Sequence, residues 1–193
     1  PSPQVVRLHR LSAFKMPPSS FHMAGLKWNY ANSAALARQC DAVILAVKPH
    51  VVPDVLVQIH DAVAAHRPLV VSIAAGVTLE RIESLLPSGT RVMRAMPNMA
   101  AAAGESMTAL AAGRSATRED LEDVRRLMSA VGRTVTMAEK NFSAFVGLAG
   151  SSPAFVLTFI EALARAGVMD GIPKAQAVEI VTQAVLGSAR IVQ

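Results

Sequence analysis

Short apolar segments that end at proline or at a glycine-containing loop limit most strongly what this chain can fold into. They lie at residues 42–47 (AVILAV), 69–73 (LVVSI) and 91–96 (RVMRAM). The first two are rich in Val and Ile and are bounded by turn formers, which is typical of strands buried on both faces. The sequence therefore predicts a sheet whose central strands have little contact with solvent.

Helical patterns separate most of these strands. Helices are predicted at 53–65, 78–86 and 117–131. Pro53 suits the first turn of the first helix, and Thr78 can cap the second. Glu119 and Asp120 favour the N-terminus of the third. Two more strands are expected at 106–112 and 134–137. This alternation indicates βαβ crossovers. We therefore predict that residues 32–138 form a doubly wound, mostly parallel, Rossmann-like α/β domain that is incomplete at its N-terminus.

Residues 139–193 have a different pattern, with two helices and no strand. The helix predicted at 153–166 is apolar nearly all round, and the one at 172–193 follows after Gly167 and Gly171. A short glycine-containing turn predicts an antiparallel pair, and so apolar a helix must be buried against something else. We expect an all-helical substrate-binding and dimerisation domain that is truncated here, with a partner chain covering the first helix.

Residues 1–31 form a basic segment without a clear period, and we leave its fold unassigned. The net charge of +5 comes from residues 1–40, which hold five Lys and Arg and no acid; the rest has 14 basic and 14 acidic residues. A basic, acid-free start is typical of an organelle transit peptide. A damaged N-terminal region is the alternative, and the charge gives no indication of nucleic-acid binding.

Composition argues against several classes of protein. The single cysteine, Cys40, excludes a disulfide framework, and the five histidines show no metal-ligand spacing, so no metal site is expected. Aromatic residues make up 4% of the chain, too few for a base-stacking nucleic-acid surface. No uninterrupted apolar run reaches about 18 residues, so we predict no membrane span.

The loops that follow the parallel strands are the candidate ligand site, because ligands bind at the carboxyl ends of such strands. They are residues 48–50 (KPH), 74–78 (AAGVT) and 97–98 (PN). Lys48 is a cation placed where it could meet phosphate or ribose oxygens. Ordinary turns and a solvated lysine are the alternative interpretation. Residues 1–75 contain one glycine, Gly25, so the GxGxxG phosphate loop of dinucleotide folds cannot be present there.

Six motifs follow one another along the chain. They are AVILAVKPH at 42–50, VVSIAAGVT at 70–78, RVMRAMPN at 91–98, FVGLAGSSPAF at 145–155, IEALARA at 160–166 and DGIPKAQAVEIVTQAVLG at 170–187. In order and spacing, from about residue 32 to 193, they resemble the pyrroline-5-carboxylate reductase family. Two other families of the same broad fold, hydroxyacid and imine reductases, fit these motifs less well.

The resemblance implies hydride transfer from NADPH or NADH to the C=N bond of 1-pyrroline-5-carboxylate, giving L-proline, in a homodimer or larger homo-oligomer without a metal. It places Glu139 near the substrate pocket. It implies a cytoplasmic enzyme, or a mitochondrial one if the basic start is a transit peptide. The residues that it places at the cofactor are Asn32, Ala46, Val47, Lys48, Pro49, Ala75, Gly76, Pro97 and Asn98.

The chain departs from the family pattern in several places. Met99-Ala100 stands where Thr-Pro is usual, and Ser143 where Asp is common. The substrate loop of the family, similar to DxVxSPGGTT, would lie beyond Gln193, so no catalytic residue is assigned within this chain. We expect a fragment or truncated copy of the enzyme. The alternative is a catalytically silent homologue that only pairs with an intact subunit.

Overall fold

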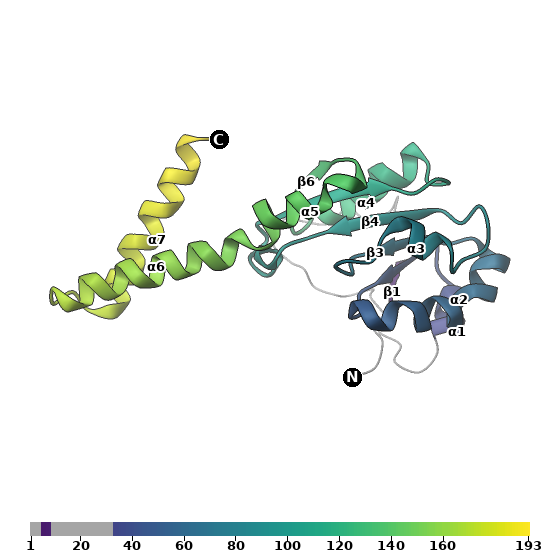
Figure 1. The fold of residues 1–193 in the computed structure, drawn as a ribbon, viewed down its shortest axis with the longest axis horizontal. Coiled ribbons are helices and arrows are strands. Elements are labelled where there is room, and N and C mark those ends of the chain that lie inside the picture. Colours follow the sequence, from purple (N-terminus) through teal and green to yellow (C-terminus); the bar gives the residue numbers. More distant parts are fainter. Residues whose placement is uncertain (1–4, 9–32) are drawn as a thin grey trace. The chain divides into compact units, whose positions relative to one another are not determined.

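The computed structural model describes residues 5–8 and 33–193, which separate into two compact units. The first ends at Phe145 and the second is Val146–Gln193 (Figure 1). Residues 139–145, which the sequence analysis places with the helices, make their contacts within the first unit. The predicted cofactor residue Asn32 and most of the basic segment 1–31 lie outside the described residues.

A six-stranded sheet in the order β1-β2-β3-β4-β5-β6 forms the centre of the first unit. Strands β2, β3 and β4 are parallel, β5 is antiparallel to β4, β6 is parallel to β5, and β1 is antiparallel to β2. This mostly parallel α/β sheet confirms the predicted fold class. The strands are β1 Val5–Leu8, β2 Ala42–Leu45, β3 Leu69–Ser72, β4 Val92–Met96, β5 Ser106–Ala112 and β6 Gly132–Thr136.

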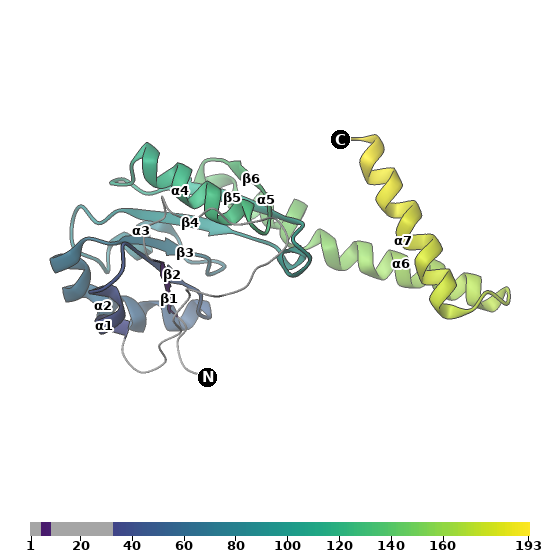
Figure 2. The same cartoon turned by 180° about the vertical axis from the view of Figure 1, so that it is seen from behind.

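Helices cover both faces of this sheet. In Figures 1 and 2, α1 (Ser33–Ala37) and α2 (Val52–His66) lie on one side and α4 (Arg118–Ser129) on the other. Helix α3 (Leu79–Glu83) packs against β4 and ends before the predicted residue 86. On the α4 side, β2, β3, β4 and β5 each contribute apolar side chains to one core cluster. Strands β2 and β3 are buried along their whole length, as predicted.

Local capping explains where two of these helices begin. The Thr78 hydroxyl oxygen accepts the backbone N–H of Arg81 at 3.2 Å, which caps α3. Thr117 and Asp120 form a reciprocal capping box at the start of α4. Both pairs satisfy backbone N–H groups that have no partner within the helix. The predicted starts at 78 and 117 are therefore correct.

Shorter helical segments complete the first unit and lead into the second. Three 3₁₀ turns span Pro49–Val51, Met99–Ala103 and Glu139–Asn141. Helix α5 (Phe142–Phe145) buries both of its phenylalanines, and a π-helical segment, Val146–Gly150, follows it.

The second unit consists mainly of α6 (Ser152–Met169) and α7 (Lys174–Ile191). The chain reverses direction between them at Gly171, whose φ of +88° favours glycine. The two helices are in contact near this turn and diverge away from it (Figure 1), so they pack together less than the predicted antiparallel pair. Ala164 in α6 and Ala177 in α7 are the buried residues of these two helices.

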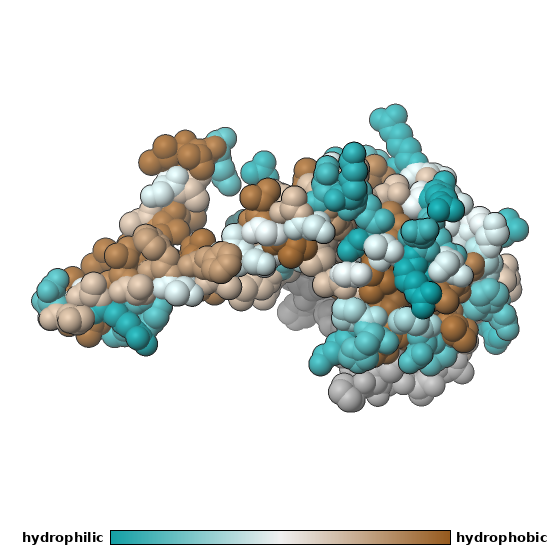
Figure 3. All heavy atoms as spheres, viewed as in Figure 1, coloured by the Kyte–Doolittle hydropathy of each residue, from teal (hydrophilic) through white to brown (hydrophobic). Residues whose placement is uncertain are grey.

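Apolar side chains therefore cover much of the surface of α6 and α7 (Figure 3). Phe155 is 70% exposed and Phe159 is 54% exposed. By length and composition alone, the helical stretch Glu139–Met169 could also cross a membrane. The few charged residues that interrupt this stretch do not exclude a span, so the expected absence of one stays a prediction.

Candidate functional site

The structure brings most of the predicted cofactor residues to one edge of the sheet. Strands β2, β3 and β4 are parallel, and Leu45 pairs with Ser72, which pairs with Arg94. The segments that follow these strands must therefore leave from the same edge. They contain the predicted residues Ala46, Val47, Lys48 and Pro49 after β2, Ala75 and Gly76 after β3, and Pro97 and Asn98 after β4.

Lys48 lies at the N-terminus of the 3₁₀ turn Pro49–Val51, with an extended backbone conformation. Its carbonyl oxygen accepts the N–H of Val51 at 2.9 Å, which fixes the direction in which the chain turns back. The side chain is exposed. It is thus a cation at the edge where the three loops meet, suited to an anionic group.

The loop after β3 leaves its backbone accessible. Gly76 has a φ of +75°, and apart from the glycine and its two chain neighbours no atom of the described residues lies within 4 Å of the position that a Cβ would occupy. Ala75 and Gly76 are exposed, whereas the flanking Ala74 and Val77 are buried and hold the loop on the sheet. The positive φ accounts for the glycine, and the open space allows a ligand to approach the main chain closely.

The loop after β4 is organised by Asn98 itself. Its side-chain oxygen accepts the N–H of Ala100 at 3.1 Å, which caps the 3₁₀ turn Met99–Ala103. Its backbone N–H donates to the hydroxyl of Ser106 at 3.2 Å, and that hydroxyl lies 3.2 Å from the Thr108 hydroxyl. The structure therefore gives Asn98 a role in shaping the loop, which the sequence analysis did not predict.

Glu139 lies in an ion pair with Arg94 of β4, with 2.6 Å between Glu139 Oε1 and Arg94 Nη1. The same oxygen accepts the backbone N–H of Leu79, the first residue of α3, at 2.8 Å. The guanidinium of Arg94 also lies over the ring of Phe142, 4.7 Å from its centre. Arg94 is a functional candidate that sequence reasoning missed. Its signal was a charged residue inside an otherwise apolar strand.

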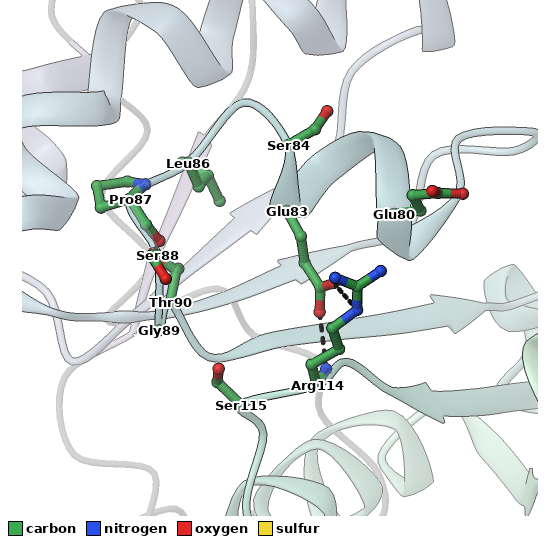
Figure 4. A pocket seen from close by; sticks show the side chains of 10 residues that line it. All are labelled: Glu80, Glu83, Ser84, Leu86, Pro87, Ser88, Gly89, Thr90, Arg114 and Ser115. Carbon is green, nitrogen blue, oxygen red and sulfur yellow. Dashed lines mark hydrogen bonds and ion pairs between the residues drawn. The ribbon is translucent and has the colours of Figure 1, made fainter.

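The structure also has a pocket of about 380 Å³, but the predicted ligand loops do not line it. It is formed by the end of α3, the loop that leads to β4, and Arg114 and Ser115 after β5 (Figure 4). Glu83 accepts the backbone N–H of Arg114 at 2.7 Å, and its other oxygen lies 3.5 Å from Arg114 Nε, so the two charges here compensate each other. Among the described residues, no three His, Cys, Asp or Glu side chains are grouped as metal ligands would be.

Comparison with known proteins connects both units to a family. Residues 139–193 match the family described as pyrroline-5-carboxylate reductase dimerisation, and residues 20–76 match NADP oxidoreductase coenzyme F420-dependent. The chain is 41% identical over 160 residues to the pyrroline-5-carboxylate reductase of Methanosarcina acetivorans, covering 83% of this chain and 59% of that protein. The chain belongs to the pyrroline-5-carboxylate reductase family.

Other members of the pyrroline-5-carboxylate reductase family are similar over the same large part of the chain. The Escherichia coli enzyme is 41% identical over 165 residues, covering 85% of this chain and 61% of its own. The Streptococcus pyogenes enzyme structure has a TM-score of 0.74 at 43% identity, covering 81% of this chain and 59% of its own. A Plasmodium falciparum pyrroline carboxylate reductase structure with NADP bound has a TM-score of 0.78 at 28% identity, covering 84% of this chain and 61% of that one. The chain thus spans about three fifths of the length of the curated relatives that it matches.

Proposed function

We propose that this chain contains the dinucleotide-binding and subunit-pairing parts of a pyrroline-5-carboxylate reductase. That enzyme would transfer hydride from NADPH or NADH to the C=N bond of 1-pyrroline-5-carboxylate and release L-proline. The observation that carries the proposal is the family match across both units. The convergence of three loops at one sheet edge supports it.

The residues at that edge fit a dinucleotide. Gly76 leaves main-chain N–H groups open to an approaching phosphate, and the exposed Lys48 offers a compensating charge. When bound, the cofactor would supply the hydride. We propose that the chain binds and orients it through the residues predicted above, Asn32 included.

The substrate side of the proposal rests on Glu139. One of its oxygens is occupied by Arg94 and Leu79, which leaves the second oxygen to face a ligand. Because the side chain retains 25% exposure, a small ligand can reach it. A carboxylate there would favour the protonated imine, which accepts hydride more readily.

We propose that a second subunit covers the exposed apolar faces of α6 and α7. Contiguous exposed apolar surface marks an interaction site, and identical subunits are the usual partners. The match of residues 139–193 to a dimerisation family favours this partner over a lipid bilayer. The same surface also favours a second candidate function, a silent homologue that only pairs with an intact subunit. We also propose that the reductase is cytoplasmic.

Calorimetric titration of the purified chain with NADPH and with NADH tests the cofactor site. Saturable binding in the micromolar range is expected, and Lys48→Gln should weaken it about tenfold if the lysine meets a phosphate. Arg118→Gln is the matched control, because Arg118 is exposed at the start of α4, which follows the opposite sheet edge. Absence of binding up to millimolar concentrations would overturn the cofactor proposal.

Complementation of a proline auxotroph then separates the two functions. Growth supported by this chain alone would establish the reductase and exclude the silent homologue. Failure to grow, together with co-purification on a tagged full-length reductase subunit, would establish pairing, and the titration above would then decide whether the chain also has the cofactor site of the reductase.

A further inference from the structure

A buried guanidinium in the middle of the sheet needs an explanation. Arg94 is the third residue of β4 and is 6% exposed, and its neighbours Met93 and Ala95 belong to the apolar core. Its Nε has no hydrogen-bond partner among the described residues. Burial of a charge is costly unless it is paired. A strand of this composition would fold more readily with an apolar residue at position 94, so stability alone does not account for the arginine.

The contacts of Arg94 join three separate parts of the first unit. Its Nη1 donates to Glu139 Oε1, in the segment that follows β6, and its face lies on Phe142 of α5. The Leu79 N–H donates to the same Glu139 oxygen. One carboxylate oxygen thereby connects strand β4 with the first residue of α3.

Both connected points are next to the proposed dinucleotide loops. Leu79 directly follows residues 74–78, in which Gly76 has free space around it and a conformation that few residues adopt. Arg94 lies two residues before Met96, where β4 ends and the Pro97-Asn98 loop begins. Fixing the Leu79 amide therefore limits the conformations of a loop that otherwise has few contacts at its tip.

We propose that Arg94 is a positioning residue for the dinucleotide site. It orients Glu139 so that Glu139 Oε1 anchors the Leu79 amide, and this anchor keeps the backbone of residues 74–78 in its binding conformation. The inference rests on the proposed function, because it assigns a task to that same site. Arg94 itself need not touch the cofactor.

The chain provides a matched control at the other end of the same strand. Arg91, just before β4, pairs with the buried Asp120 at 2.7 Å, and Asp120 belongs to the capping box of α4. Arg91 thus also connects a strand to the start of a helix through a carboxylate. Because α4 follows β5, which is antiparallel to β4, this connection lies at the edge away from residues 74–78.

Hydrogen–deuterium exchange on the full chain decides the inference without requiring ligand. In Arg94→Met, amides of residues 74–81 should exchange about tenfold faster, the factor that one charge-assisted hydrogen bond represents. Arg91→Met should leave these amides unchanged and affect the start of α4. Arg94→Lys retains the charge and one donor, so it should restore part of the protection. It also serves as the test variant if Arg94→Met does not fold.

Titration with NADPH gives the functional consequence. Arg94→Met should raise the dissociation constant about tenfold, Arg94→Lys less, and Arg91→Met not at all. Equal exchange in Arg94→Met and wild type, or equal NADPH affinity in the two, would overturn the inference. If the wild-type chain binds no dinucleotide, the proposed function fails, and the exchange comparison still decides whether Arg94 orders this loop.

Discussion

Removal of the Glu139 carboxylate should cost far more stability than an ordinary surface substitution. In Glu139→Leu the Arg94 charge would remain buried without its acceptor, and loss of one partner of a buried pair costs about 3–5 kcal/mol. Because Glu139 is 25% exposed, water reaches its side of the pair, so the lower end, about 3 kcal/mol, applies. Loss of the acceptor for the Leu79 N–H adds about 1 kcal/mol. We expect the free energy of unfolding to fall by about 4 kcal/mol.

A double mutant separates burial of an unpaired charge from loss of packing. Arg94→Met/Glu139→Leu removes both charges and leaves the Leu79 N–H without its acceptor, so its cost should be about 1 kcal/mol, less than that of Glu139→Leu alone. Urea denaturation followed by far-ultraviolet circular dichroism measures the free energy of unfolding of the wild type, Arg94→Met, Glu139→Leu and the double mutant. Unchanged m values show that the unfolded state is the same in all four.

Burial of the ion pair, and not the distance between its charged atoms, should decide how far the effects of the Arg94 and Glu139 substitutions depend on each other. Arg126 and Asp123 of α4 are also 2.6 Å apart, but the arginine is exposed, so Arg126→Met should cost less than about 0.5 kcal/mol. If the Arg94 and Glu139 substitutions are additive within about 0.5 kcal/mol, the reasoning from a buried, shared charge is refuted.

Three further predictions concern other parts of the chain. Gly132→Ala should lower the free energy of unfolding by about 3 kcal/mol in urea denaturation, because its Cβ would overlap the β5 backbone, whereas Gly104→Ala, with open space, should cost about 1 kcal/mol. Hydrogen bonds from Lys174 and Arg165 lower the pKa of the Glu161 carboxyl from 4.5, so NMR titration should find a higher pKa in Lys174→Met. The contribution of these bonds to the stability of the fold is present above the ordinary pKa and is lost as the pH falls through the lowered value. Phe159→Asp should weaken self-association at least about tenfold in sedimentation experiments, and unchanged association would place the interface elsewhere.

The sequence was most informative where local chemistry decides the structure. The strand at 42–47 was predicted from an apolar run ended by Lys48-Pro49, and the structure has it as Ala42–Leu45. The start of α3 followed from Thr78 as an N-cap, and the start of α4 from the carboxylates Glu119 and Asp120 in its first turn, because both signals act within one helical turn. Such signals need no knowledge of the tertiary structure.

The direction of the strands was harder to predict from the sequence, although the length of one connection was informative. Residues 97–105 between β4 and β5 contain a 3₁₀ turn and no long helix, which is too short for the crossover that a parallel pair needs. That pair is antiparallel. Strand β1, in the segment without a periodic pattern, is held by pairing with β2, which composition does not reveal.

The contacts of Glu139 show why the candidate site could be located but not interpreted from the sequence. Its partners Arg94 and Leu79 are 45 and 60 positions away, and only the packing of α3 and β4 brings them together. The family resemblance assigned Glu139 to the substrate, whereas the structure shows one oxygen already engaged in holding the fold. Loss of activity in a Glu139 variant would therefore not identify a substrate ligand. Only an effect that exceeds the one caused by Arg94→Met, which disturbs the same anchor without removing the carboxylate, would do so.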